Sequence, residues 1–234
     1  MKTAVMTDSN SGISKSEAEE LGIFSLPMPV IIDGTTCNEG IDLTQEMFYQ
    51  SLTGGKEVST SQPSPGEVME MWDEILAKGY DEIVHIPMSS GLSNSYESAA
   101  GLAKDYSGKV QVVDNHRISV TLRESVLEAK ELADRGLLAK DIKKELEERA
   151  YEACIYITVD TLEFLKKGGR ITPAGAAIGA MLNIKPVLTI QGEKLDAFAK
   201  VRGMKKGKHK MLEALRQDLD SRFKGVDMSR IVIG

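Results

Sequence analysis

Residues 3–32 have the sequence TAVMTDSNSGISKSEAEELGIFSLPMPVII, in which a helical segment separates two apolar runs. Ser14 and Glu17 fit a capping box at the start of that helix, and Gly22 fits its end. Two buried strands joined through a helix form a crossover connection, which parallel strands require. The stretch therefore predicts an α/β fold with a largely parallel sheet.

The same alternation continues along the chain. Ser64, Pro65 and Glu67 mark a second helix start, with proline at the first helical position. Further apolar runs suited to buried strands lie at 82–86, 110–113, 155–159, 186–190 and 231–233.

The pattern of residue types changes after the helical stretch 118–150, which itself breaks near Gly136. We expect residues 1–150 to form a three-layer α/β domain with a mostly parallel sheet covered on both faces. Residues 151–234 are expected to form a second, smaller α/β domain. It is expected to be incomplete at its C-terminal end, because 231–233 begins a strand without a successor.

The composition argues against several classes of function. A net charge of −6, with both signs mixed along the sequence, argues against a nucleic-acid surface. Cys37 and Cys154 lack the spacing of a disulfide framework or a metal site, which favours reduced thiols and a cytoplasmic protein. We expect no signal peptide and no membrane-spanning segment.

Hydroxyl side chains are concentrated after two of the apolar runs, at 7–11 and 89–95, and also at 58–63, which precedes the run 82–86. Ligands of parallel α/β sheets bind beyond the carboxyl ends of the strands, so these loops are candidate binding residues. Each has an ordinary alternative. Ser93 can be a helix N-cap, Thr60 and Ser61 can form a polar turn, and Asp8 can be a cap or turn residue.

A second candidate region spans 164–173, where two glycines precede Arg170. This arginine can bind a carboxylate or phosphate, or it can simply follow a helix C-cap into solvent. Residues 200–210, including Arg202, form a basic cluster that is either a solvated face or a docking site for an acidic partner. Residues 174–182 are small and apolar, so that helix is expected to be mostly buried or to line an apolar cavity.

Enzyme motifs are absent from the sequence, including the nucleophile elbow, the Walker loop and the dinucleotide-binding glycines. His85, between Val84 and Ile86, is interpreted as a structural histidine with satisfied hydrogen bonds. An enzyme remains one hypothesis. It would act on a small phosphorylated or carboxylated metabolite, with Asp8 as acid or base and Arg170 holding the anion.

Taken in order, five motifs resemble the DegV family over nearly the whole chain, and Lys200-Val201-Arg202 adds to them. They are Thr7-Asp8-Ser9, Thr60-Ser61-Gln62-Pro63, Ser89-Ser90-Gly91-Leu92-Ser93, Leu165-Lys166-Lys167-Gly168-Gly169-Arg170-Ile171 and Lys185-Pro186-Val187-Leu188.

The resemblance implies a non-enzymatic bacterial carrier with a long-chain fatty acid between its two domains and no other cofactor. Such proteins are similar to the binding subunits of bacterial fatty acid kinase, which present the acyl carboxylate to a separate ATP-dependent subunit for acyl phosphate formation. Thr60 and Ser93 match the hydroxyls that hold the carboxylate, with Ser61 and Arg170 in the same polar network. Arg202 matches a residue of kinase docking. No nucleic acid and no stable membrane insertion are implied.

The sequence departs from the family pattern in two places. Asn94 and Ser95 replace the Gly-Thr pair that commonly follows the serine. Family members also continue beyond residue 234 with a histidine of the head-group network, which has no counterpart here.

Overall fold

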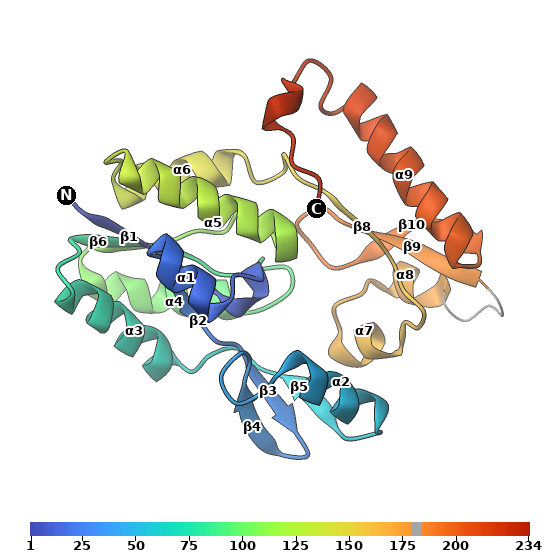
Figure 1. Ribbon diagram of the computed structural model, residues 1–234, viewed down its shortest axis with the longest axis horizontal. Helices are drawn as coiled ribbons and strands as arrows, with labels where there is room; N and C mark the ends of the chain where they lie inside the picture. The colour runs from blue at the N-terminus through green and yellow to red at the C-terminus, as the bar shows by residue number, and fades with distance from the viewer. Residues whose placement is uncertain (179–183) are drawn as a thin grey trace. The chain divides into compact units, whose positions relative to one another are not determined.

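The computed structural model describes residues 1–178 and 184–234. Its fold is mixed α/β, as the sequence predicted. The chain divides into two compact units, Met1–Ala153 and Cys154–Gly234, which are described separately below (Figure 1).

The central sheet of the first unit is parallel throughout, in the order β2-β1-β6-β7. Its strands are β1 (Thr3–Asp8), β2 (Phe24–Leu26), β6 (Glu82–Ile86) and β7 (Val110–Val112). Every residue of β1 and β6 is buried. These two strands therefore form the middle of the unit, and their carboxyl ends lie at the same edge of the sheet.

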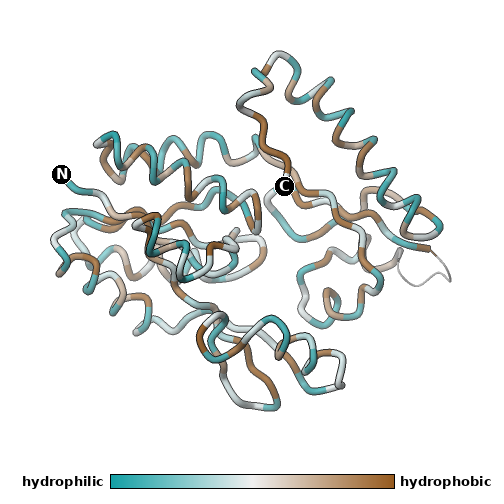
Figure 2. The backbone as a smooth tube through the Cα atoms, viewed as in Figure 1, coloured by the Kyte–Doolittle hydropathy of each residue, from teal (hydrophilic) through white to brown (hydrophobic). Residues whose placement is uncertain are grey.

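Helices cover both faces of this sheet (Figure 1). Val5 and Val84 pack on one face against α1 (Lys15–Leu21), α5 (Ser119–Asp134) and α6 (Ala139–Glu148). Met6 and Ile83 face the other way, against α3 (Pro65–Ala77) and α4 (Ser95–Leu102). Figure 2 shows hydrophilic and hydrophobic residues alternating along these helices, as amphipathic covering layers require. The unit thus has the expected three layers.

Local capping signals fix several helix ends. Ser14 Oγ accepts from the Glu17 amide, and Gly22 ends α1 with a positive φ of 66°. Ser64 and Glu67 form the predicted capping box of α3. The helical stretch breaks between α5 and α6 at Gly136, whose φ is 86°. Short 3-10 turns follow β1 and α4, η1 (Ser9–Ser11) and η2 (Ala103–Tyr106).

A small antiparallel sheet in the order β4-β3-β5 completes the first unit. It consists of β3 (Pro29–Ile32), β4 (Thr35–Asn38) and β5 (Val58–Thr60), with α2 (Gln45–Thr53) between the last two strands. The apolar run 23–32 is therefore not one strand. It breaks at Pro27 and Met28, and its halves belong to two sheets, β2 and β3.

The second unit has an antiparallel sheet in the order β10-β9-β8. Its elements are β8 (Ile155–Thr158), β9 (Ile184–Ile190), β10 (Asp196–Arg202), α7 (Glu163–Gly168), α8 (Pro173–Ile178), α9 (Met204–Asp220) and η3 (Met228–Arg230). The strand expected at 231–233 is wrong: these residues follow η3 without secondary structure, and in the described part of the unit no strand pairs with them. Within the described residues, no helix combines the length and the apolar character needed to cross a membrane.

Candidate functional site

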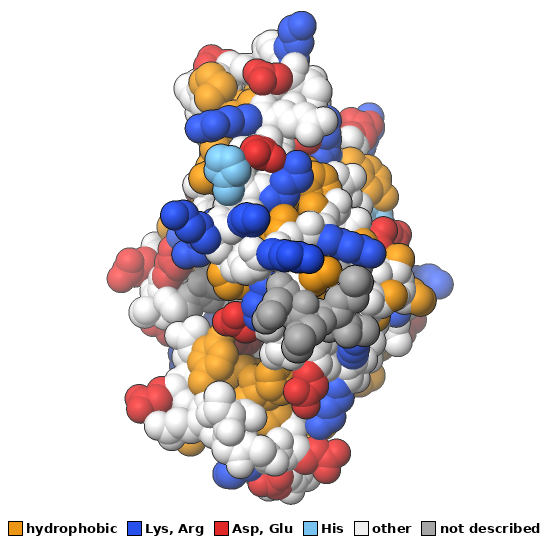
Figure 3. Space-filling view, turned by 90° about the vertical axis from the view of Figure 1, so that its right-hand side faces the viewer, with side chains coloured by type: hydrophobic (Ala, Val, Ile, Leu, Met, Phe, Trp, Pro, Cys, Tyr) orange, Lys and Arg blue, Asp and Glu red, His pale blue; other side chains and the backbone are white. Residues whose placement is uncertain are grey.

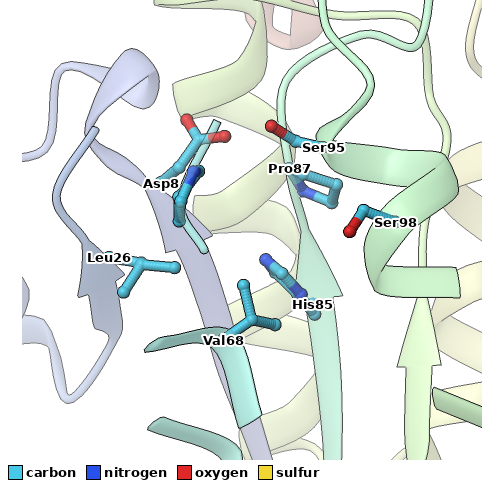
Figure 4. Close-up of a pocket in the computed structure, with 8 residues that line it drawn as sticks. Asp8, Leu26, Val68, His85, Pro87, Ser95 and Ser98 are labelled. Atoms are coloured by element: carbon cyan, nitrogen blue, oxygen red, sulfur yellow. The ribbon is translucent and has the colours of Figure 1, made fainter. Parts of the chain in front are cut away.

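Two of the predicted loops meet at one pocket of the first unit (Figure 4). Pro63, which follows the Thr60-Ser61-Gln62 segment, and Ser95, which follows Ser93, both line it. The enclosed cavity is small, about 10 Å³, and opens to solvent; its remaining lining is Asp8, Leu26, Val68, His85, Pro87 and Ser98. Segments far apart in the sequence therefore converge beyond the carboxyl ends of β1 and β6.

Ser93 is half-buried in the loop between β6 and α4. Its Oγ accepts from the Ser95 amide at 3.2 Å and lies 2.8 Å from Ser95 Oγ. A hydroxyl has one hydrogen to donate and two lone pairs. When Ser95 Oγ donates to Ser93 Oγ, the Ser93 hydrogen is left to donate to an anion.

This geometry is compatible with both interpretations of Ser93, as a residue that caps its own helix and as a residue that binds a ligand. The residue serves its own helix, since it accepts from the first residue of α4, although the cap position itself is Asn94. Ser95 was not predicted as a site residue. The signal for it was the hydroxyl itself, which the threonine of the family pattern also carries and which here contacts Ser93 Oγ directly.

Thr60 is the last residue of β5 and is exposed. It lies opposite Val30 in the antiparallel pair, so its side chain is on the face of the small sheet that carries Val30. Ser61 is also exposed, and its amide donates to Pro29 O at 3.1 Å. In the described part of the chain neither hydroxyl has an assigned hydrogen bond, so both can take a ligand from solvent.

Asp8 ends β1 and is 2 % exposed. Its Oδ2 accepts from the Met88 amide at 2.9 Å, and its Oδ1 accepts from the Asn10 amide at 3.0 Å. Burial raises the pKa of the Asp8 carboxyl from 3.8 to about 6, against the opposing effect of these hydrogen bonds. Asp8 is thus a cap, as one interpretation held, and it also reaches across to the loop that carries Ser93.

His85 lies on the central strand β6 with its ring edge-to-face with Trp72, 5.7 Å between centroids. Burial lowers the pKa of its imidazole to about 3, so the ring is neutral at pH 7. Within the described residues Nδ1 has no hydrogen-bond partner, although it is buried. The expectation that all its hydrogen bonds are satisfied is therefore wrong for this nitrogen, which belongs to a residue that borders the pocket.

Arg170 belongs to the second unit, just after α7. Gly169 ends this helix with a positive φ of 70°, as the two-glycine pattern indicated. Arg170 is half-buried, and its Nη1 donates to Gly168 O at 2.7 Å. The guanidinium is therefore held against its own helix end.

A basic surface of the second unit surrounds Arg202, the exposed last residue of β10 (Figure 3). We define it by its exposed cations, Lys200, Arg202, Lys205, Lys206 and Lys208. The last three lie in the first two turns of α9, and His209 follows them. Their charges suit contact with an acidic surface, whereas the chain as a whole is acidic.

The expectation for 174–182 is only partly testable, because 179–183 lie outside the described residues. In α8 the side chains of Ala174 and Ala177 are exposed, and Gly175 is buried against Ile171. The described part of this helix is thus not buried on most sides. Among residues 1–178 and 184–234, no group of three or more His, Cys, Asp or Glu side chains is arranged to hold a metal ion.

Comparison with known proteins identifies relatives of this chain. Residues 2–227 match the DegV family, whose members are described as uncharacterised proteins. A DegV domain-containing protein of Deinococcus radiodurans is 36% identical over 218 residues, 93% of this chain and 77% of the relative. Protein DegV of Bacillus subtilis is 35% identical over 237 residues, 100% of this chain and 83% of that protein.

Solved structures that resemble this chain belong to the same family. A DegV family protein from Thermus thermophilus, described for its fatty acid binding, superposes with a TM-score of 0.85 at 33% identity, covering 94% of this chain and 79% of that one. DegV from Bacillus subtilis, described as a fatty acid binding protein, gives a TM-score of 0.81 at 33% identity with the same coverage.

Proposed function

This chain belongs to the DegV family, and on that premise we propose that it binds a long-chain fatty acid, with the carboxylate held by Thr60 and Ser93. Two structural neighbours are described as fatty acid binding proteins, which supports the ligand class. The proposal includes Ser61 and Arg170 in the polar network around the carboxylate.

One observation carries the head-group assignment. Pro63 and Ser95, the last residues of the Thr60–Pro63 and Ser93–Ser95 segments, line the same pocket, and Ser93 has a hydroxyl hydrogen available when Ser95 donates to it. Neutral donors suit an ionised carboxylate, because hydrogen bonds to a charged acceptor are roughly twice as strong as neutral ones. The hydroxyls of Thr60 and Ser93 themselves add no buried charge when the site is empty.

The energetics favour a ligand with a long apolar tail. Roughly fifteen methylenes at about 0.8 kcal/mol each contribute on the order of 10 kcal/mol when they leave water. An unpaired buried carboxylate costs several kcal/mol, so the head group needs donors whereas the tail needs none.

We further propose that the protein is a carrier without catalysis of its own, which presents the bound acid to an ATP-dependent kinase subunit for acyl phosphate formation. The basic surface around Arg202 is the proposed docking site. Its exposed lysines and arginine suit an acidic partner surface, where such charges accelerate encounter and set orientation.

The test is the dissociation constant of a long-chain fatty acid for the delipidated protein. Thr60→Ala and Ser93→Ala are each expected to weaken binding by about 1 to 3 kcal/mol, the cost of an unmet bond to a charged group. Ser59→Ala is the matched control, because Ser59 is exposed on the same strand but its side chain points to the opposite face. Unchanged affinity in the Thr60→Ala/Ser93→Ala double variant would refute the site.

The alternative of an enzyme with Asp8 as acid or base has less support. A pKa near 6 suits acid–base catalysis. However, both carboxylate oxygens of Asp8 already accept backbone amides, from Met88 and Asn10. The carboxylate is thus engaged in holding the backbone.

A further inference from the structure

The loop that carries Ser93 is held by two side chains, one at the end of β1 and one just beyond the end of β7. In the sheet order, β1 and β7 are the neighbours of β6. Asp8, at the end of β1, accepts from the Met88 amide at 2.9 Å. Asp114, two residues beyond β7, accepts from the Ser90 amide at 3.3 Å.

The Ser89 amide, between those of Met88 and Ser90, also donates to a segment outside the loop. Ser89 N donates to Arg117 O at 2.9 Å, so three consecutive amides of the loop are fixed to flanking segments. Ser89 in turn holds Ser93, because its carbonyl oxygen accepts from the amides of Leu92 and Ser93, at 3.0 and 3.2 Å. A continuous series of bonded segments therefore runs from Asp8 to the backbone of Ser93.

We propose that Asp8 is a positioning residue for the Ser93 hydroxyl, acting through the Met88 amide while Asp114 acts through the Ser90 amide from the other side. The inference rests on the proposed function, since it concerns the hydroxyl assigned there to the fatty acid carboxylate. Asp8 contacts the loop through the Met88 amide, and it also lines the pocket that Ser95 borders. Its carboxylate is suited to this role because charge-assisted bonds are roughly twice as strong as neutral ones.

Glu82 offers a matched control within the same sheet. It is a buried carboxylate that accepts from the Ala139 amide at 2.7 Å and from Thr3 Oγ1 at 2.8 Å. It lies at the start of β6, whereas the Ser93 loop follows the end of that strand. Loss of Glu82 therefore disturbs the same sheet at the opposite edge.

The experiment measures the dissociation constant of oleate for the full, delipidated chain. Asp8→Ala is expected to weaken binding about tenfold, and Asp8→Asn less, because asparagine keeps one acceptor oxygen. Asp8→Ala/Ser93→Ala is expected to bind no more weakly than Ser93→Ala alone, since Asp8 acts through Ser93. Glu82→Gln is expected to keep wild-type affinity.

Multiplied losses in the double variant, wild-type affinity in Asp8→Ala, or equal weakening by Glu82→Gln and Asp8→Asn would each overturn the positioning role. Unchanged affinity in Ser93→Ala would instead count against the proposed head-group site. Should Asp8→Ala not fold, Asp8→Asn and Asp8→Asn/Ser93→Ala provide the same comparison.

Discussion

Replacing Asp8 by asparagine should change how the stability of the first unit depends on pH. Burial raises the pKa of this carboxyl from 3.8 to about 6 in the folded protein. A raised folded pKa means that the native state binds the proton more tightly than the unfolded chain does. The stability that protonated Asp8 contributes is therefore complete below about pH 3.8 and is lost as the pH rises through 6.

The magnitude follows from these two pKa values. A rise from 3.8 to about 6, at about 1.36 kcal/mol per pH unit, corresponds to about 3 kcal/mol. Against a typical unfolding free energy of about 5 to 15 kcal/mol, such a loss is measurable. The asparagine side chain does not titrate, so the wild-type free energy of unfolding minus that of Asp8→Asn isolates the carboxyl group.

The assay is urea unfolding at several values between about pH 4 and pH 7.5, followed by tryptophan fluorescence. Trp72 is the single tryptophan and is fully buried in the first unit, so its emission reports that unit. The difference between the two proteins should fall by most of the 3 kcal/mol as the pH rises. A difference that stays flat, or that grows with pH, would show that Asp8 is not buried as an ionisable group in this way.

Three further predictions concern the second unit. Arg202→Ala should lower acyl phosphate formation by a kinase subunit while the dissociation constant for the fatty acid stays unchanged, because an exposed charge at the docking surface affects the rate at which the two proteins associate. Equal loss of acyl phosphate formation and of fatty acid binding would indicate misfolding. Ala177→Leu should shift the co-purified fatty acids toward shorter chains at constant melting temperature if α8 borders the tail, since Ala177 is exposed and added bulk there strains no core. An unaltered lipid profile by mass spectrometry would contradict this. The corresponding change at Ala180 lies outside the described residues. Asp218→Ala should destabilise the second unit by about 1 to 3 kcal/mol, because it removes the acceptor of the hydrogen bonds from Cys154 Sγ and Tyr156 Oη. The measurement is urea unfolding followed by circular dichroism. A variant as stable as wild type would show that these hydrogen bonds contribute nothing.

Sequence patterns predicted those elements whose signals are local. The buried runs of β1 and β6 and the capping residues Ser14 and Ser64 depend on nearby residues, so they were placed correctly. β10 was missed because its seven residues alternate between exposed and half-buried and include charged side chains, unlike a fully buried strand. The run 231–233 is apolar, but a strand needs a hydrogen-bonded neighbour, which sequence composition cannot supply.

The candidate site shows the same division. The hydroxyls at 7–11 and 89–95 were singled out because they follow apolar runs, and Thr60 and Ser93 were assigned through the family resemblance. The bond from Asp8 to the Met88 amide joins residues 80 positions apart, and no local pattern indicates it. Likewise, Ser95 keeps a hydroxyl where the family pattern has threonine, but only the 2.8 Å approach to Ser93 gives that hydroxyl a chemical meaning.

Asp8 and Glu82 lie at opposite ends of the strands of one parallel sheet. Both are buried carboxylates that accept backbone amides across long sequence separations. Glu82 ties the amino end of β6 to the start of α6, where the bond only joins covering layer to sheet. Asp8 ties the carboxyl end to a loop, where no regular secondary structure fixes the backbone. The Asp8 carboxyl, whose burial reduces stability at neutral pH, lies at the edge of the sheet where we propose that the ligand binds.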